Sequence, residues 1–241
     1  MALYYRTRGF VFKKTDRGEA DQLFTIYTED FGRIEILGKA IRKIKSKLRS
    51  GAELFYFSEI EFIQGKAYKT LTDAIPIERF ENIRKDLEKL EISHQIAELL
   101  GELIRGQEKD DNIFCLLVEV FDKLNNLKNE KIIYHYFFWN LFSFLGYQID
   151  FYHCLVCQKK LTPENLYFDI NGGGIVCSNC YKKHKKGEII FPDVIKILRI
   201  FLNKDWNLLK RLKIKEEEVS LLKKISKQYL SFYQKEKKLL T

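Results

Sequence analysis

The sequence predicts an α+β protein with more than one domain: an N-terminal β-barrel, then an all-α domain into which a four-cysteine zinc ribbon is inserted. Three observations lead to this fold class. Residues 1–78 carry short apolar and aromatic runs between turn signals, and residues from 79 onward follow helical spacing. Two C-x-x-C pairs stand inside the helical part. The 241 residues are enough for one large domain or two ordinary ones, and the 46% hydrophobic content is ample for packed cores.

Residues 1–78 are expected to form about five short strands. The runs "YYRTRGFVFKKT" and "DQLFTIYT" are rich in β-branched and aromatic residues, which favour strands. In "GRIEILG", Ile34 and Ile36 share one face, with charged residues on the other. The runs "ELFYFSEIEFIQG" and "AYKTLTDAIPI" complete the set. So many strands in so short a segment favour a barrel, because closure removes the exposed edges of the sheet.

The segment "GKAIRKIKSKLRSG", residues 38–51, lies between the third and fourth of these strands and contains six basic residues and no acidic one. Ile41, Ile44 and Leu48 are spaced three and four apart, so helical periodicity would place them on one face and the cations on the rest. Five strands with a helix or a long loop at this point are the layout of an OB-fold. OB-folds commonly bind oligonucleotides on an open face flanked by loops.

Residues 79–241 read as helices. "RFENIRKDLEKLEISHQIAELLGELIRG" has apolar residues near helical spacing, as one helix or two, and "NIFCLLVEVFDKLNN" continues the pattern. "KIIYHYFFWNLFSFLG" is apolar nearly all round, which predicts a buried central helix. Cys115 is interpreted as a core residue on an apolar helix face. We therefore expect an OB-fold domain at 1–78 and a helical domain at 79–241, with the ribbon at 150–187.

The cysteine pairs "CLVC" and "CSNC" have the spacing C-x2-C-x19-C-x2-C. Two such pairs can supply the tetrahedral thiolate set that Zn²⁺ prefers, and the stretch between them reads as a hairpin with its turn at 171–174. The predicted ligands of one structural zinc ion are Cys154, Cys157, Cys177 and Cys180. Four protein ligands leave no position for water, so a catalytic zinc is not expected.

The alternatives for these cysteines are four unrelated thiols or one redox pair. A thioredoxin-like pair would follow a strand in a βαβ context, and the sequence lacks that context. His153 and His184 flank the cysteine pairs, and we expect both to lie outside the ligand set or to face solvent.

The net charge is +9, unevenly spread. Residues 1–80 hold 15 Lys and Arg against 11 Asp and Glu, residues 81–180 hold 10 against 15, and residues 181–241 hold 17 against 7. Basic ends around an acidic middle make contact with nucleic acid or an acidic surface plausible. The sequence shows neither a signal peptide nor a membrane-spanning run, so we expect a cytoplasmic protein. It also lacks a P-loop, a nucleophile elbow and HExxH, so we expect no enzyme.

Phosphate contact is the functional interpretation of the basic residues, and a solvated charged face is the alternative. The leading candidates are Lys39, Arg42, Lys43, Lys45, Lys47 and Arg49. The secondary candidates, on or after the first strand, are Arg6, Arg8, Lys13 and Lys14. Bases could stack on Tyr5, Tyr27 or Phe31, although a core position is the commoner role for each. The lysines at 182–186, beside the ribbon, are a weaker candidate for an extension of the DNA track.

The stretch "GEADQLFTIYTEDFGRIEILGKAIRKIKSKL" closely resembles the first domain of RecO, a family of bacterial recombination mediators and DNA repair proteins. The residues that carry the resemblance are Gly18-Glu19, Asp21, Thr28, Phe31-Gly32-Arg33, Gly38, Arg42, Ser46 and Leu48. The later order of helices, cysteine ribbon and further helices is also similar to that family. An arginine pair frequent in the family after the glycine is replaced here by "AIRK".

The resemblance implies an OB-fold, a helical domain and a zinc ribbon. It implies binding of single- and double-stranded DNA and annealing of complementary strands, in a protein associated with the nucleoid. It also implies partnership with RecR and single-strand-binding protein, which helps to load RecA. An RNA- or translation-associated protein with an OB-fold and a zinc ribbon is the alternative, and a zinc-dependent enzyme is the third hypothesis.

Overall fold

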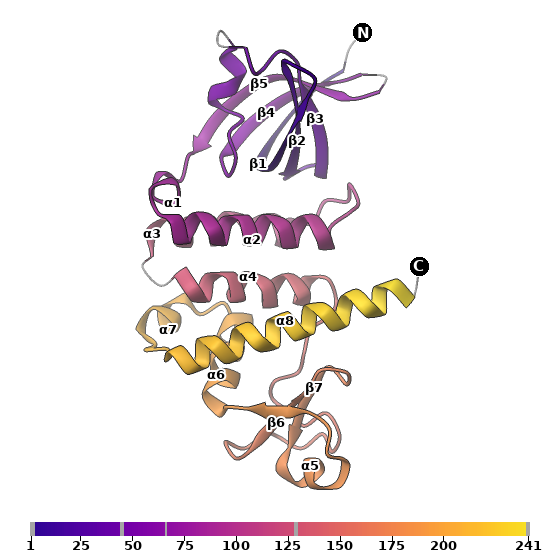
Figure 1. Ribbon diagram of the computed structural model, residues 1–241, viewed down its shortest axis with the longest axis vertical. Helices are drawn as coiled ribbons and strands as arrows, with labels where there is room; N and C mark the ends of the chain where they lie inside the picture. Colours follow the sequence, from indigo (N-terminus) through magenta and orange to yellow (C-terminus); the bar gives the residue numbers. More distant parts are fainter. Residues whose placement is uncertain (1–2, 44–45, 66, 128–129, 240–241) are drawn as a thin grey trace. The chain divides into compact units, whose positions relative to one another are not determined.

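The computed structural model describes residues 3–43, 46–65, 67–127 and 130–239. The chain divides into two compact units, Met1–Glu130 and Lys131–Thr241. The first unit contains a β-barrel and three helices, and the second contains the remaining helices and the ribbon (Figure 1).

The barrel consists of β1 (Tyr4–Arg17), β2 (Asp21–Thr28), β3 (Gly32–Gly38), β4 (Phe57–Gln64) and β5 (Lys69–Glu78). It is closed in the order β1-β2-β3-β5-β4. Strand β1 pairs antiparallel with both β2 and β4, and β3 pairs with β5 in parallel. This topology confirms the predicted OB-like barrel.

The barrel core comes from the strand residues that alternate inward. Phe24, Ile26 and Ile36 are fully buried, and Ile34 and Ile60 are within 1% of full burial. Burying one such side chain stabilises a fold by about 1.5–3 kcal/mol. The alternation seen in the sequence therefore supplies most of the interior of the barrel.

The helix expected in the 38–51 segment is not an α-helix in the part that the structure describes. Lys43 N–H donates to the Ala40 carbonyl (3.1 Å) and Ser46 N–H to the Lys43 carbonyl (3.0 Å), and a 3₁₀ helix, η1 (Lys47–Ser50), follows. Ile41 is buried and Leu48 packs against the barrel core, while Ile44 lies outside the described residues. Turns with bonds three residues apart also bring apolar residues onto one face, so the spacing did not require an α-helix.

Three helices complete the first unit: α1 (Glu81–Lys85), α2 (Leu87–Leu103) and α3 (Asp111–Asn126). Asp86 and Asp110 cap α2 and α3, each carboxylate accepting two backbone N–H groups. The Phe121 ring of α3 lies 5.3 Å from the Phe10 ring of β1 and 5.9 Å from the Phe55 ring. These helices therefore share a compact unit with the barrel, although the change from strand to helix occurs after Glu78.

Cys115 is exposed, so its interpretation as a core residue is wrong. At about 100° per residue, Cys115 lies about 200° around α3 from Ile113. The buried residues of that helix are Ile113, Phe114, Leu116, Leu117, Val120, Phe121 and Leu124. Cys115 thus points away from the core despite two apolar neighbours in the sequence.

In the second unit, α4 (Glu130–Phe144) is the buried central helix that the sequence predicts. Around it lie α6 (Pro192–Leu202), α7 (Trp206–Arg211) and α8 (Glu216–Leu239). The rings of Tyr136 and Phe201 are 5.9 Å apart, and those of Trp139 and Tyr229 are 5.2 Å apart. Among the helices of the described residues, none has the length and apolarity that a bilayer crossing needs.

Gly51 lies against the backbone of β5, where an added Cβ would come 1.8 Å from the Ala74 carbonyl oxygen. We expect Gly51→Ala to destabilise the first unit by about 3 kcal/mol, because the loop must leave the barrel. Gly101→Ala is the control: Gly101 lies inside α2 with only one atom near its Cβ position, at 3.8 Å, so this change should stabilise by about 0.5–1 kcal/mol. Hydrogen exchange of barrel amides measures the stability change in each variant. Equal changes in the two variants would contradict the role of Gly51.

Burial, with the charge of Lys223 as a second cause, lowers the pKa of His135 to about 4. Its imidazole bonds to Ser226 Oγ at 3.0 Å. In the unfolded chain His135 binds a proton below a pH of about 6.5, whereas in the folded chain it stays neutral down to a pH of about 4. The free energy of unfolding therefore falls as the pH falls from about 6.5 to about 4.

We expect the second unit to lose about 2 kcal/mol through His135 between pH 7 and pH 5. Urea unfolding of the wild type and of His135→Gln at both pH values measures this loss, because glutamine retains hydrogen bonding but does not titrate. Parallel pH dependence in the two proteins would show that His135 is not responsible.

Candidate metal centre and nucleic-acid interface

The ribbon contains a three-stranded sheet, with one cysteine pair in the loop before it and the other at the junction of β7 and the helix α5 (Ser178–His184). Strands β6 (Leu166–Asp169) and β7 (Gly174–Cys177) pair antiparallel, and β8 (Glu188–Ile190) pairs with the other edge of β6. Residues 170–173 form the turn, one residue earlier than the predicted 171–174. The loop of the first cysteine pair docks on this hairpin, because Leu155 N–H donates to the Ile175 carbonyl at 2.7 Å. Gly172 leaves room for the Leu155 side chain, since an added Cβ would come 2.5 Å from Leu155 Cδ2.

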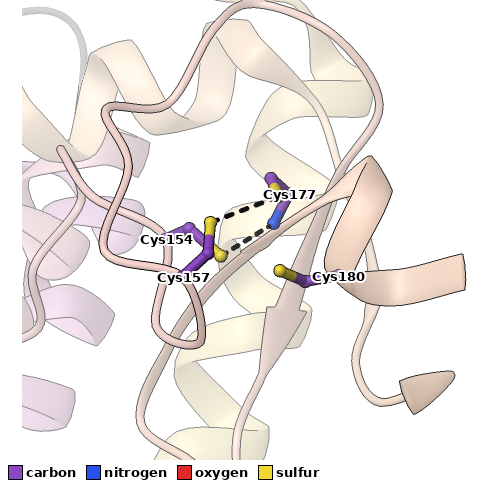
Figure 2. Close-up of side chains that lie close together, drawn as sticks. All are labelled: Cys154, Cys157, Cys177 and Cys180. Atoms are coloured by element: carbon purple, nitrogen blue, oxygen red, sulfur yellow. Dashed lines mark hydrogen bonds between the residues drawn. The ribbon is translucent and has the colours of Figure 1, made fainter. Parts of the chain in front are cut away.

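The four cysteine side chains point toward one another (Figure 2). Their Sγ atoms all lie within 4.8 Å of one another, and Cys157 Sγ is 3.9 Å from Cys177 Sγ. With Zn–S bonds of about 2.3 Å, a tetrahedral Zn²⁺ site places its sulfurs about 3.8 Å apart. Cys154 and Cys180 are buried and the other two cysteines are more exposed. The donor set therefore fits a zinc ion after a small contraction.

The electrostatics of the cluster favour a bound cation. Burial alone would raise the pKa of Cys154, but backbone N–H groups of Cys157, Cys177 and Val156 lower it to about 6. Burial and the neighbouring sulfur atoms raise the pKa of Cys180 to about 12. One thiolate thus forms readily while the last resists ionisation, because several negative charges would crowd together. A divalent cation removes that repulsion.

The two histidines near the cluster are not part of it. His153 and His184 are exposed, and His153 Nδ1 lies 2.9 Å from a carboxylate oxygen of Asp150. The metal-binding group found among the described residues contains the four cysteines and neither histidine, as expected.

The predicted DNA-binding arginines of β1 are paired with carboxylates on the barrel surface. Arg6 pairs with Glu59 and lies 3.9 Å from Glu61. Arg8 donates two hydrogen bonds to Glu29, at 2.7 and 2.6 Å, and this bond and charge raise the pKa of Arg8. Both guanidinium groups remain more than half exposed.

Three further candidates also have acidic neighbours. Lys14 lies 2.9 Å from Glu53, Arg49 lies 4.0 Å from the same carboxylate, and Arg42 lies 3.3 Å from Asp16. The Lys14 pair is partly buried, whereas Arg42 and Arg49 are more exposed. Exposed pairs are worth about 0–1 kcal/mol, so a phosphate can replace the carboxylates of Arg42 and Arg49 at little cost.

The remaining predicted cations divide into two groups. Lys13, Lys39 and Lys43 are exposed and have no ion pair within the part of the chain that the structure describes. Lys45 lies outside the described residues, as does the side chain of Lys47. The cationic run is thus partly neutralised by its own surface, a feature that charge counting along the sequence could not show.

The loop between β1 and β2, residues 18–20 and called L12 below, contacts the start of the 38–51 segment. Arg42 N–H donates to the Ala20 carbonyl (3.0 Å), and the Arg42 guanidinium donates to the Gly18 carbonyl (3.3 Å). Next to L12, the Arg17 guanidinium lies 4.4 Å from the ring centre of Tyr68 and donates to its hydroxyl at 2.7 Å. Tyr68 belongs to the connection between β4 and β5, whose described residues, 65, 67 and 68, are called L45 below. The 39–43 segment, L12 and L45 therefore form one continuous strip.

A groove of about 350 Å³ continues the strip beside Tyr68. Its lining residues are Arg33, Glu35, Gln64, Ala67, Tyr68, Lys69, Arg105 and Gln107. Arg33 is oriented by two carbonyls, donating to Gly101 (3.1 Å) and Ile104 (2.6 Å). The groove thus gathers three cations and one carboxylate, which suits an anionic ligand.

Comparison with known proteins agrees with this architecture. The N-terminal family model of recombination protein O matches residues 1–80, and the C-terminal model of the same family matches residues 84–239. The chain belongs to the RecO family. It is 33% identical over 218 residues to a protein named DNA repair protein RecO from Dehalococcoides mccartyi strain 195, covering 90% of this chain and 86% of the relative.

Two more distant RecO relatives align over nearly the whole chain. DNA repair protein RecO of Halalkalibacterium halodurans is 25% identical over 96% of this chain and 90% of its own length. DNA repair protein RecO of Desulforamulus reducens is 29% identical over 98% of this chain and 92% of its own length. The similarity to RecO proteins therefore includes the barrel, the helices and the ribbon.

Of the aromatic residues considered for base stacking in this RecO chain, Tyr27 lies in the core, and Tyr5 and Phe31 are partly buried and pack against it. Tyr27 is fully buried, and its hydroxyl is 3.5 Å from the Asp110 carbonyl. Tyr5 and Phe31 pack on Phe62, with ring centres 5.3 and 5.6 Å apart. The interpretation of these three residues as part of the core packing is the right one.

Tyr4 and Tyr68 are instead the exposed aromatic residues at the barrel surface, at 71% and 38%. The strand alternation that places Tyr5 inward could have identified Tyr4 from the sequence. Arg105 could not be found that way, because it reaches the groove only when the segment after α2 folds back on β3. At that contact, Gly32 leaves no room for a side chain: an added Cβ would come 2.2 Å from the Glu108 carbonyl oxygen.

Removing the metal should unfold the ribbon locally while leaving the barrel intact. We expect Cys154→Ser to lose bound zinc, and amides in residues 154–190 to exchange at least about tenfold faster, because the ribbon has little core of its own. Cys115→Ser is the matched control, since Cys115 is exposed on α3 and does not belong to the cluster. Zinc content and hydrogen exchange, before and after chelation, measure the effect. A ribbon that stays protected without metal would contradict the zinc site.

Proposed function

We propose that this RecO-family chain is a DNA-binding recombination mediator. It binds single- and double-stranded DNA and anneals complementary strands, and together with RecR it helps to load RecA on DNA covered by single-strand-binding protein. The observation that carries the proposal is the continuous strip of the 39–43 segment, L12 and L45 on an OB-like barrel. OB-folds bind oligonucleotides on the face flanked by these two loops.

The cations along the strip would hold the sugar-phosphate backbone. Lys39 and Lys43 act without competition from acidic neighbours, and Arg42 exchanges its carboxylate for a phosphate. The strand would then pass Arg17 and enter the groove at Tyr68, where further cations lie. Much of the affinity would come from counterion release, which does not depend on base sequence.

The other predicted residues take a smaller part in this proposal. Arg49, Lys13 and Lys14 would extend the cationic surface beyond the strip. Arg6 and Arg8 would contact DNA only after giving up their carboxylate partners on the barrel. Lys45 and Lys47 are included on their charge alone.

Annealing needs no covalent step. Two DNA strands repel each other through their phosphates, and a cationic surface that holds them lowers this repulsion and raises their local concentration. The protein therefore works as a mediator rather than as an enzyme. The roles of RecR, RecA and single-strand-binding protein rest on membership of the RecO family, and the relatives are themselves named DNA repair proteins.

Charge reversal in the strip should weaken DNA binding. For the triple variant Lys39→Glu, Arg42→Glu and Lys43→Glu we expect at least about tenfold lower affinity for single-stranded DNA. The slope of log affinity against log salt concentration should be less steep by about 2. Annealing of complementary oligonucleotides should fall with it. Fluorescence anisotropy over a salt series and a strand-annealing assay measure both effects, with circular dichroism to confirm folding.

The matched control reverses Lys85, Lys196 and Lys210, which are exposed cations that do not belong to the strip. It has the same net charge and should bind DNA within about twofold of the wild type. Equal losses in the two variants would show that only net charge matters. Stronger binding of the wild type to structured RNA than to single-stranded DNA at fixed salt would instead favour an RNA-associated protein.

A further inference from the structure

The lysines of the ribbon have no carboxylate partners among the described residues, whereas several cations of the barrel do. Residues 153–187 contain six lysines and two acidic residues. The lysines are Lys159, Lys160, Lys182, Lys183, Lys185 and Lys186. All six are exposed, and none forms an ion pair with another described residue. On the barrel, by contrast, Arg6, Arg8, Lys14, Arg42 and Arg49 each have a carboxylate within 4.0 Å.

Four of these lysines follow one another on α5 (Ser178–His184) and the residues just after it. This helix packs on the outer face of the ribbon sheet, since the rings of Tyr181 and Tyr167 stack with centres 3.4 Å apart and planes within 2°. The opposite face of the sheet belongs to the core of the unit, where Phe168 packs against Trp139 and Tyr229. The lysines therefore lie on the solvent side of a sheet whose inner face is fixed.

Both ends of the lysine segment are anchored. At its start, Cys180 belongs to the four-sulfur cluster. At its end, Lys185 and Gly187 have positive φ angles of 49° and 106°, and the Gly187 Cα approaches the Phe168 backbone so closely that an added Cβ would come 3.1 Å from it. A cationic segment held at both ends loses less backbone freedom on binding than a flexible tail would.

We infer that this lysine surface, Lys182, Lys183, Lys185 and Lys186, is a second DNA-strand site. It takes the phosphodiester backbone of the complementary strand while the barrel strip holds the first. The inference rests on the proposed function, since annealing requires two strands on one protein. A strip already neutralised by one strand attracts a second only weakly, so a separate cationic surface in the other compact unit supplies what annealing needs.

The choice of ligand follows from the charges. Each exposed lysine is a point charge that can neutralise one phosphate, and no carboxylate of the described chain competes for it. Successive lysines along an ordered segment suit a polyanion with regularly spaced phosphates. Because ammonium groups read no base edges, the site would accept strands of any sequence, as annealing requires.

The test uses the full zinc-loaded chain with all four lysines changed to glutamine. The chain is first saturated with an immobilised single strand, and capture of a labelled, non-complementary second strand is then measured. We expect first-strand affinity to stay within about twofold and second-strand capture and annealing rate to fall at least about tenfold. Unchanged zinc content shows that the ribbon is intact, and the corresponding Lys→Arg variant should retain capture.

The matched control changes Lys210, Arg211, Lys213 and Lys215 to glutamine, which removes the same charge from α7 and the loop after it. It should capture the second strand normally. Normal capture by the ribbon variant, or an equal loss in the control, would overturn the inference while leaving the barrel site standing. A wild-type chain that binds no first strand would instead overturn the proposed function and this inference with it.

Discussion

Closure of the barrel by β1 is the constraint on which the proposed DNA site depends. Strand β1 is long enough to pair with β2 along one part and with β4 along another, so its backbone groups join the two ends of the sheet. Because β2 follows β1 and β5 follows β4, closure brings the two connecting loops together. The contact between Arg17, next to L12, and Tyr68, in L45, shows that the two loops are close together. Without closure, L12 and L45 would lie at opposite edges of an open sheet and would form no common strip.

The cations on the barrel and on the ribbon differ in whether a carboxylate lies beside them. On the barrel, five of the candidate cations have a carboxylate beside them, which limits their attraction for a first phosphate. On the ribbon, the lysines have no such partners among the described residues. Ion pairs on an exposed surface are weak, so the barrel can still exchange them for phosphates, while the ribbon offers its charge directly. If the protein holds two strands at once, as we propose, it would gain from such a division.

The four-sulfur cluster connects metal chemistry to this surface. The hairpin and the first cysteine loop are already joined by a backbone hydrogen bond at Leu155, so the polypeptide brings the sulfurs near each other before any ion acts. The ion would then remove the repulsion among thiolates and fix the start of α5. A metal held by four cysteines would have no open position for a substrate, and its role would be to keep the helix that carries the lysines in place.

The sequence by itself determined the features that depend on local pattern. Strand alternation identified the inward residues of the barrel, the apolar stretch of α4 identified the central helix, and the spacing of the cysteines identified the four whose sulfur atoms gather in one cluster. Where two conformations share one spacing, local pattern was insufficient: the apolar residues of the 38–51 segment are buried by turns and a 3₁₀ helix rather than by an α-helix. The prediction that Cys115 is a core residue was wrong for a related reason, because its apolar neighbours along the chain lie on the opposite side of the helix.

Only the tertiary structure decided which charges are free. Arg8 and Glu29 are 21 positions apart and Arg6 and Glu59 are 53 apart, and they meet through the strand register of the closed barrel. Arg105 joins the groove because the segment after α2 returns to β3. A charge run is visible in one dimension, but its neutralisation depends on residues that folding brings within a few ångströms, and Coulomb energy depends on that distance rather than on separation along the chain.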